Sequence, residues 1–141
     1  MKIFHHPDEK NCLALLGACD LPTSDLEPHH FDHFLGCGTA DELLGIIGVE
    51  IFSSVALLRS LAVAEKARGT GCGKALVTAI ENYARERNIQ ELYLLTTTAK
   101  DFFIHLGYSI ADRNAAPDDI RHTREFSGIC PGSAIFMVKL I

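Results

Sequence analysis

The stretch Arg68-Gly69-Thr70-Gly71-Cys72-Gly73-Lys74 is the most informative segment of this chain. It follows an apolar run over residues 56–64 and precedes a helical pattern, which predicts a strand, a tight loop and a helix start. Glycine lets the backbone approach a ligand closely and adopt positive φ angles. A helix N-terminus offers unpaired N–H groups and a partial positive charge. We therefore expect this loop to cradle a phosphate or pyrophosphate.

The glycine spacing argues against two common phosphate-binding loops. A dinucleotide site needs G-x-G-x-x-G after the first strand of a βαβ unit, whereas these glycines fall as G-x-G-x-G in mid-chain. A Walker loop needs G-x-x-x-x-G-K-[ST], but Gly69 to Gly73 is one residue too short and Ala75 stands at the magnesium-binding position. The spacing that remains is R-x-x-G-x-G, with a plain glycine-rich turn as the alternative.

This motif resembles the acetyl-CoA pyrophosphate loop of the GNAT superfamily of N-acetyltransferases, and residues 59–64 look like that family's fourth strand. The resemblance implies an α/β (α+β) GNAT fold, with a central mixed, mostly antiparallel sheet and helices on both faces. It also implies acetyl-CoA as cosubstrate. The expected cofactor-binding residues are Leu61, Ala62, Val63, Arg68, Gly69, Thr70, Gly71, Cys72, Gly73 and Lys74.

Composition limits the class of protein further. The 141 residues suit one domain over residues 1–141, and an apolar fraction of 48% favours a globular fold. A net charge of −5 argues against nucleic acid or an anionic membrane as the main partner. No run of 18 apolar residues occurs and the start lacks the apolar core of a signal peptide, so we expect a cytoplasmic protein.

Cysteine and histidine spacing does not indicate a metal site. The five cysteines include no C-x-x-C pair, which argues against a disulfide framework and against structural zinc. His29, His30 and His33 lie close together in sequence, but a partly exposed polar face explains them better than a metal centre. We expect no metal, and the sequence leaves open whether the chain is a monomer or a homodimer.

Hydrophobic periodicity predicts helices and strands around a central sheet. Leu76, Ala79, Ile80 and Tyr83 recur at helical spacing after the glycine loop. The expected helices are residues 8–20, the segment from the loop to about Asn88, residues 99–106 and a turn at 117–122. The expected strands are residues 33–37, 43–52, 55–64, 92–97, 108–111 and 133–140.

A second family block fits residues 96–108 in spacing. The family commonly reads N-x-x-A-x-x-x-Y-x-x-x-G-[FY], and Ala99, Gly107 and Tyr108 match it. Thr96 stands at the Asn position and Phe103 at the Tyr position, and both are expected to contact the cofactor. Because that Tyr often protonates the leaving CoA thiolate, phenylalanine leaves the usual general acid absent from its usual place. Core packing is the alternative for Phe103.

A more specific resemblance is to the acetyltransferase branch associated with arsenic-resistance operons. It rests on residues 56–64, 92–99, 102–108, 120–126 and 130–134. It implies an acetyl-CoA-dependent transferase linked to arsenic detoxification, and we expect the acceptor to be a primary amine of a small molecule. An amine-bearing organoarsenical or a related amino-acid-like antimetabolite is one candidate acceptor. Cys130 could contact trivalent arsenic directly, although a single thiol makes a poor arsenic site.

The candidate catalytic residues are Glu50, Glu125, Tyr108 and Cys130. A lysine-like amine has a pKa near ~10, so a base or a water chain must remove its proton before it attacks. Glu50 and Glu125 are the candidate bases, with a solvent-facing strand end and a surface ion pair as the alternatives. Tyr108 and Cys130 are the candidate acids, and the amide of Ala62 is the candidate oxyanion donor.

Arg59 lies inside an apolar strand, where a charged residue must be paired or face a cleft. We therefore expect Arg59, with Arg121 and Arg124 from the tail, to bind an acidic group of the acceptor, and we expect Glu125 to belong to the acceptor site as well. Solvated surface charge is the alternative for the two tail arginines.

Three functions remain open: a small-molecule N-acetyltransferase, a CoA-binding sensor that has lost catalysis, and a protein N-acetyltransferase.

Overall fold

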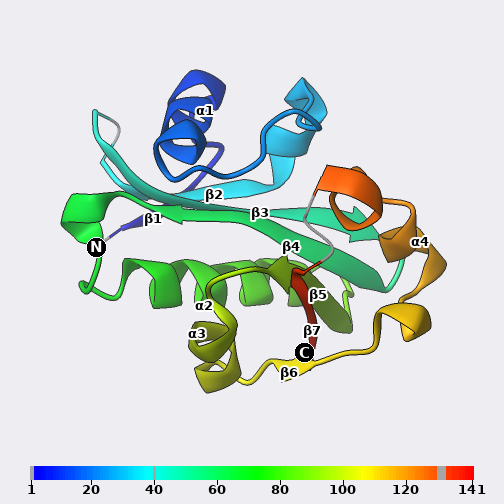
Figure 1. Ribbon diagram of the computed structural model, residues 1–141. Helices are drawn as coiled ribbons and strands as arrows, with labels where there is room; N and C mark the ends of the chain where they lie inside the picture. Colours follow the sequence, from blue (N-terminus) through cyan, green and yellow to red (C-terminus); the bar gives the residue numbers. More distant parts are fainter. Residues whose placement is uncertain (1, 40, 130–132) are drawn as a thin grey trace.

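A computed structural model of the protein describes residues 2–39, 41–129 and 133–141 (Figure 1). Within these residues, one sheet carries its strands in the order β1-β2-β3-β4-β5-β7-β6. Neighbouring strands are antiparallel except β4 and β5, which run parallel. The strands are β1 (Ile3–His5), β2 (Phe34–Gly38), β3 (Leu43–Phe52), β4 (Val55–Val63), β5 (Glu91–Thr96), β6 (Ser109–Ile110) and β7 (Ile135–Leu140).

Helices cover both faces of the sheet, with α1 and α2 on opposite sides (Figure 1). The α-helices are α1 (Glu9–Ala18), α2 (Cys72–Arg85), α3 (Lys100–His105) and α4 (Asp118–Arg121). Three 3₁₀ turns, η1 (Pro28–His33), η2 (Glu65–Ala67) and η3 (Arg113–Ala115), and a π-helical turn, η4 (Glu125–Ile129), complete the described elements. The expected α/β class, with a mostly antiparallel sheet between helices, is confirmed.

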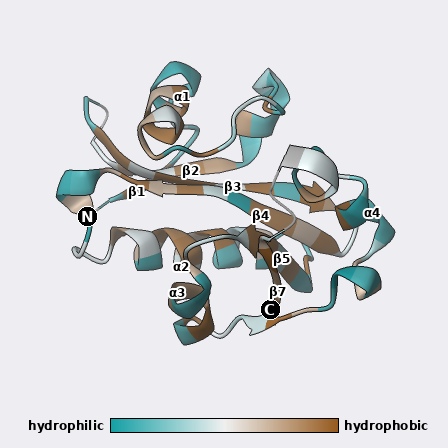
Figure 2. Cartoon of the chain, in the orientation of Figure 1, coloured by the Kyte–Doolittle hydropathy of each residue, from teal (hydrophilic) through white to brown (hydrophobic). Residues whose placement is uncertain are grey.

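The apolar stripe of α2 forms one side of the main core. Leu76, Ile80 and Ala84 are fully buried, and α2 packs on β2, β3 and β4. Figure 2 shows hydrophobic residues along the strands of the sheet, between the two layers of helices. The helical spacing after the glycine loop therefore predicted the buried face of α2 correctly. By contrast, β1 and η4 had no counterpart in the sequence pattern.

A bulge in β4 inserts one extra residue into its pairing with β3. Arg59 lies opposite Gly48 and Ala62 lies opposite Ile46, so the two residues 60 and 61 share one partner on β3. Ser60 has a φ of 58°, a left-handed conformation that few residues other than glycine adopt. The bulge therefore coincides with the residue of β4 that has a positive φ.

The bulge reverses which β4 residues face α2. Ala56 and Leu58, before the bulge, belong to the core under α2, and Leu61 and Val63 pack against the same core after it. Side chains alternate between the two faces of a strand, so the inserted residue explains why even-numbered residues face α2 before the bulge and odd-numbered residues face it afterwards. Arg59 consequently points to the opposite face of the sheet, where α1 and the segment after it lie.

Two glycines offer a matched test of this packing. A Cβ built at Gly48 would lie 2.4 Å from a ring carbon of Phe34, which is only 1% exposed, whereas nothing lies within 4 Å of one at Gly17 in α1. We expect Gly48→Ala to lower the free energy of unfolding by about 1–3 kcal/mol. Gly17→Ala should raise it by about 0.5–1 kcal/mol, because alanine favours a helix. Urea unfolding measures both, and an unchanged midpoint for Gly48→Ala would contradict the packing.

Candidate functional site

A cavity of about 490 Å³, the first cavity, opens where β4 and β5 separate. In the described part of the chain, the two strands pair only over Val55–Leu57 and Glu91–Tyr93. Residues 58–61 of β4 and residues 94–99 of β5 and its following turn then form opposite walls of the cavity. The first cavity is therefore a product of the parting of two parallel strands.

Backbone amides of β4 face this cavity. The amide of Ala64 donates to the carbonyl of Leu44 on β3. Because N–H groups alternate in direction along a strand, the amide of Ala62 also points to β3, while those of Leu61 and Val63 point to the side of the cavity. Leu61 lines the cavity. The geometry thus favours Leu61 and Val63 over Ala62 as sources of a donor to a ligand.

The glycine loop leads into an uncapped helix N-terminus. Gly69 and Gly71 have φ angles of 79° and 88°, which explains why glycine stands at both positions. Gly71 is the N-cap of α2, and no side chain of the described residues caps that end. The first-turn amides of a helix lack intrahelical acceptors and carry partial positive charge. This geometry fits the anion cradle that the sequence predicted.

The side chains of the loop divide into surface and core. The Arg68 Nε donates to the carbonyl of Val63 at 3.3 Å, and both Arg68 and Lys74 are exposed. The Thr70 hydroxyl donates to the carbonyl of Ala67, which closes the turn. Cys72 is only 1% exposed, and burial raises the pKa of its thiol to about 12. Cys72 therefore acts as a small core residue.

The second block connects the loop to the cavity through α3. Thr96 and Phe103 both line the first cavity. The Thr96 Oγ1 accepts a hydrogen bond at 3.0 Å from the amide that precedes α3. Phe103 packs edge-on against Phe102, and a Cβ built at Gly73 would lie 3.3 Å from the Phe102 ring. The glycine loop and the first cavity therefore adjoin the same short helix.

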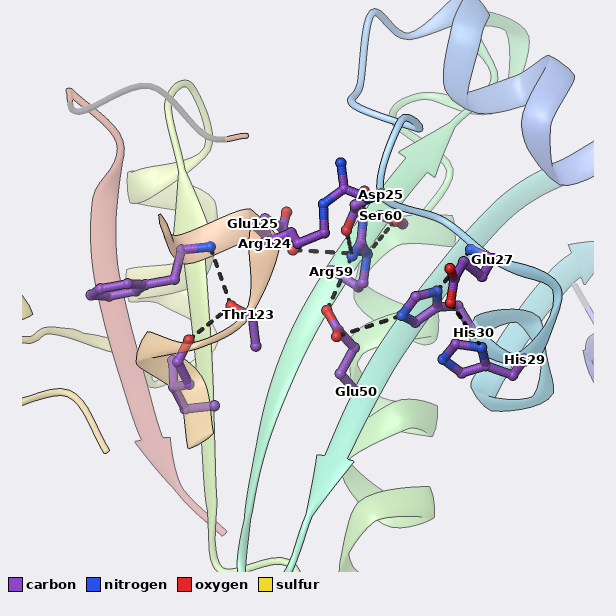
Figure 3. Close-up of polar contacts among 12 residues, drawn as sticks. Asp25, Glu27, His29, His30, Glu50, Arg59, Ser60, Thr123, Arg124 and Glu125 are labelled. Atoms are coloured by element: carbon purple, nitrogen blue, oxygen red, sulfur yellow. Dashed lines mark hydrogen bonds and ion pairs between the residues drawn. The ribbon is translucent and has the colours of Figure 1, made fainter. Parts of the chain in front are cut away.

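Arg59 is buried in a cluster of carboxylates (Figure 3). Its side chain is 1% exposed, and its guanidinium donates twice to Asp25 and, at 3.1 Å, to Glu50. Its Nε donates to Ser60 Oγ at 3.0 Å and lies 3.8 Å from Glu125 Oε2. Burial by itself would lower the pKa of Arg59, but the carboxylates raise it above its ordinary value. Arg59 is thus both paired and at a cavity wall.

We call Arg59, Asp25, Glu50 and Glu125 the Arg59 cluster. Its members come from the segment between α1 and η1, from β3 and β4, and from η4 (Figure 3). Asp25 was not predicted from the sequence, because 34 residues separate it from Arg59 and no local pattern marks it. Only the unusual burial of Arg59 signalled that an acidic partner must exist.

A second cavity, of about 350 Å³, borders the same cluster. Asp25 and Glu50 line the second cavity, whereas Arg59 and Glu125 line the first. The His30 Nδ1 accepts the Glu27 amide at 2.9 Å, so its Nε2 carries the proton of the neutral ring. That Nε2 lies 3.7 Å from Glu50 Oε1. The two candidate bases therefore face different cavities.

Of three other predicted site residues, two lie away from both cavities and one lies outside the residues that the structure describes. Tyr108 is 3% exposed, its hydroxyl donates to Glu81 Oε2 at 3.0 Å, and burial raises its pKa further. Arg121 is exposed and donates to the carbonyl of Asn114 at 2.7 Å. Cys130 lies outside the described residues. The structure thus brings neither Tyr108 nor Arg121 to the first cavity.

Metal-ligating residues do not converge in the part of the chain that the structure describes, where no group of three or more His, Cys, Asp or Glu could hold an ion. In the same residues, every helix is too short or too polar to cross a membrane.

Asp25 should make stability depend on acid pH. Burial raises the pKa of this carboxyl, but the hydrogen bond and charge of Arg59 outweigh burial and hold the pKa below its ordinary value. A depressed folded-state pKa stabilises the fold above the unfolded pKa, and this contribution is lost as pH falls through the folded pKa. We expect Asp25→Asn to be less stable than the parent at pH ~7, with a difference that shrinks below pH ~4.

Chemical unfolding across that pH range measures the difference for Asp25→Asn. The control is Asp101→Asn, at an exposed position of α3, which should change stability little at either pH. A stability difference for Asp25→Asn that is the same at both pH values would contradict the pairing with Arg59.

Residues 5–108 match the model of the acetyltransferase (GNAT) family. The chain is 36% identical to mouse N-alpha-acetyltransferase 80 over 56 residues, which is 40% of this chain and 18% of that protein. It is 28% identical over 92 residues to an uncharacterized N-acetyltransferase of Chlorobaculum tepidum, which covers 64% of this chain and 59% of the relative. The chain therefore spans less than two thirds of the length of either relative.

The fold is similar to that of N-acetylglutamate synthase from Neisseria gonorrhoeae in complex with coenzyme A and N-acetyl-glutamate. The TM-score is 0.84 at 21% identity, over 99% of this chain and 34% of that one. The matched family segment contains the parted strand β4, the glycine loop, α2 and the second block. On this sequence match and this geometry, the chain belongs to the acetyltransferase (GNAT) family.

Proposed function

We propose that this protein transfers an acetyl group from acetyl-CoA to the primary amine of a small molecule. The observation that carries the proposal is the first cavity, which adjoins the same short helix as the uncapped N-terminus of α2. A thioester cosubstrate with a phosphate-bearing end needs both features: donors for the phosphates and a channel for the acyl arm. The fold neighbour from Neisseria, which binds coenzyme A, supports the same assignment.

The chain offers a partner for each part of acetyl-CoA. The first-turn amides of α2 and the side chains of Arg68 and Lys74 suit the phosphates. The amides of Leu61 and Val63 suit the peptide-like groups of the pantetheine arm and the carbonyl oxygen on which negative charge develops. Phe103 provides an apolar wall of the cavity. No metal is part of this proposal.

Acetyl transfer requires that the amine nitrogen attack the thioester carbon, forming a C–N bond while the C–S bond breaks. The attacking amine must first lose a proton. We assign the removal of that proton to Glu125, because Glu125 lines the first cavity and Glu50 does not. The leaving thiolate takes its proton from water. Phe103 has no acidic proton to donate, and the Tyr108 hydroxyl already donates to Glu81. Glu50 then supports the site through Arg59.

A link to arsenic resistance is the finer part of the proposal. It is supported by the branch-like blocks in the sequence, of which residues 120–126 and 130–134 lie beyond the family match. An amine panel that includes arsenical amines without an anionic group tests the link, because rapid turnover of those amines alone would support it. Since acetyl-CoA is the proposed cosubstrate, we also propose the cytoplasm as its location.

A CoA-binding sensor is the second candidate function, and Phe103 at the usual Tyr position favours it. The two functions differ in one measurement. Release of free thiol from acetyl-CoA with any primary amine supports the enzyme, whereas tight CoA binding without turnover on a broad amine panel supports the sensor.

Gly71 tests the proposed phosphate cradle. Gly71→Asp puts a carboxylate at the N-terminus of α2 and should abolish CoA binding, because like charges repel the phosphates. Gly71→Asn is the matched control, since asparagine has the same size and tolerates the positive φ of 88° without the charge. We expect Gly71→Asn to bind CoA at least about 10-fold more tightly than Gly71→Asp by calorimetry. Equal, parent-like binding of both variants would show that the loop does not hold the phosphates.

Glu125 tests the proposed base. Glu125→Gln should lower kcat by about 10²–10⁴-fold near neutral pH, with part of the loss recovered at high pH, where more of the amine is already neutral. The KM for acetyl-CoA should change little. Glu50→Gln should have a smaller effect on kcat, because Glu50 faces the second cavity. A larger kcat loss in Glu50→Gln than in Glu125→Gln would reverse the assignment.

A further inference from the structure

We propose, building on the acetyl transfer inferred above, that the acceptor is a cationic amine that bears no acidic group. The class comprises alkylamines and diamines and excludes amino acids and amines that carry a carboxylate or an oxyanion of phosphorus or arsenic. The proposal rests on the hydrogen bonds of Arg59 and on the charges that line the two cavities.

Arg59 has little capacity left for a substrate anion. Of the five N–H donors of its guanidinium, two are directed at Asp25, one at Glu50 and one at Ser60 Oγ. Among the described contacts, this leaves one N–H on Nη2, whereas a substrate carboxylate binds arginine best through two parallel bonds. An acidic acceptor would have to displace a buried internal carboxylate, which would leave that group buried without its partner.

Carboxylates outnumber arginines around both cavities, and His29, His30 and His122 also line the second cavity. The carboxylates that line them are Asp20, Asp25, Glu27, Glu50, Asp119 and Glu125, and the arginines are Arg59 and Arg124. Three carboxylates surround Arg59 alone, so the formal charge of the Arg59 cluster is negative. A cluster of this sign attracts an ammonium group and repels an anion.

The remaining cations are poorly placed to compensate. Arg124 is exposed and donates to the carbonyl of Ser24 at 3.4 Å. The His30 Nδ1 accepts a hydrogen bond from a backbone amide, and its Nε2 faces Glu50. Both ring nitrogens therefore already have partners within the protein. Residues 130–132, outside the described part, are Cys-Pro-Gly and bring no cationic side chain. Among the described residues, the cations that line the cavities therefore offer an acidic acceptor no buried anchor beside the proposed base.

This inference separates the chain from its fold neighbour. The Neisseria synthase binds N-acetyl-glutamate, which carries two carboxylates. Arg59 was expected from the sequence to bind an acidic group of the acceptor, but its internal pairing favours the opposite charge. An ammonium group near Glu125 would instead neutralise part of the negative formal charge of the Arg59 cluster.

Three acceptors of graded charge test the proposal: the diamine putrescine, the monoamine n-butylamine and L-glutamate. Thiol release at saturating acetyl-CoA gives kcat/KM for each. We expect putrescine to exceed L-glutamate by at least about 10-fold, with n-butylamine between them. A kcat/KM for L-glutamate equal to or above that for putrescine would overturn the inference while leaving the acetyl transfer intact.

A pair of variants tests whether the cluster provides the selectivity. Glu50→Gln removes one negative charge at the cluster and should lower the putrescine to L-glutamate ratio by about 5-fold or more. Glu86→Gln, at the exposed C-terminus of α2, should leave the ratio and the KM for acetyl-CoA unchanged. An unchanged ratio in a folded Glu50→Gln protein would count against the proposal. The Tm of each variant identifies loss of folding.

If no amine is turned over, equilibrium binding still decides the inference. Calorimetry in the presence of CoA should then detect putrescine and not L-glutamate. Binding of L-glutamate, or of neither amine, would overturn the assigned charge class. Absence of CoA binding itself would overturn the proposed function, which separates the two failures.

Discussion

The site depends on the separation of β4 and β5, which pair along only part of their length. The described pairing ends at Leu57 and Tyr93, and the bulge at Ser60 follows directly in β4. Backbone N–H groups that lose a strand partner need another acceptor, because burying them unpaired is costly. The first cavity, its open strand edge and the path to the glycine loop all follow from this separation.

Burial of one guanidinium then organises the acceptor side. Arg59 faces away from α2 because the bulge falls after it, and a buried cation requires counter-charges. Asp25 and Glu125 meet that requirement from two segments that are distant in sequence. The family match ends at residue 108, so Asp25, Glu50 and Arg59 lie within the matched segment, whereas Glu125 lies beyond it.

Local patterns explain which predictions succeeded. The stripe of Leu76 and Ile80 and the positive φ of Gly71 depend on neighbours within a few residues, and both agree with the structure. Tyr108 and Arg121 were candidates for the site, but Tyr108 donates to the Glu81 carboxylate and Arg121 to the backbone carbonyl of Asn114, partners that belong to other segments. The partner of Arg59 was equally hidden, since nothing around Asp25 marks it as a counter-ion.

The sequence by itself determined the order of the main helices and strands from residue 8 onward, the strand–loop–helix cradle and the need to pair a buried arginine. These follow from periodicity, glycine spacing and the cost of burying charge. The tertiary structure alone decided that Glu125 and Glu50 face different cavities and that the donors of Arg59 are taken by carboxylates of its own chain. Charge neutralisation is a contact between segments far apart in sequence, so only folding could reveal the sign of the field that an acceptor meets.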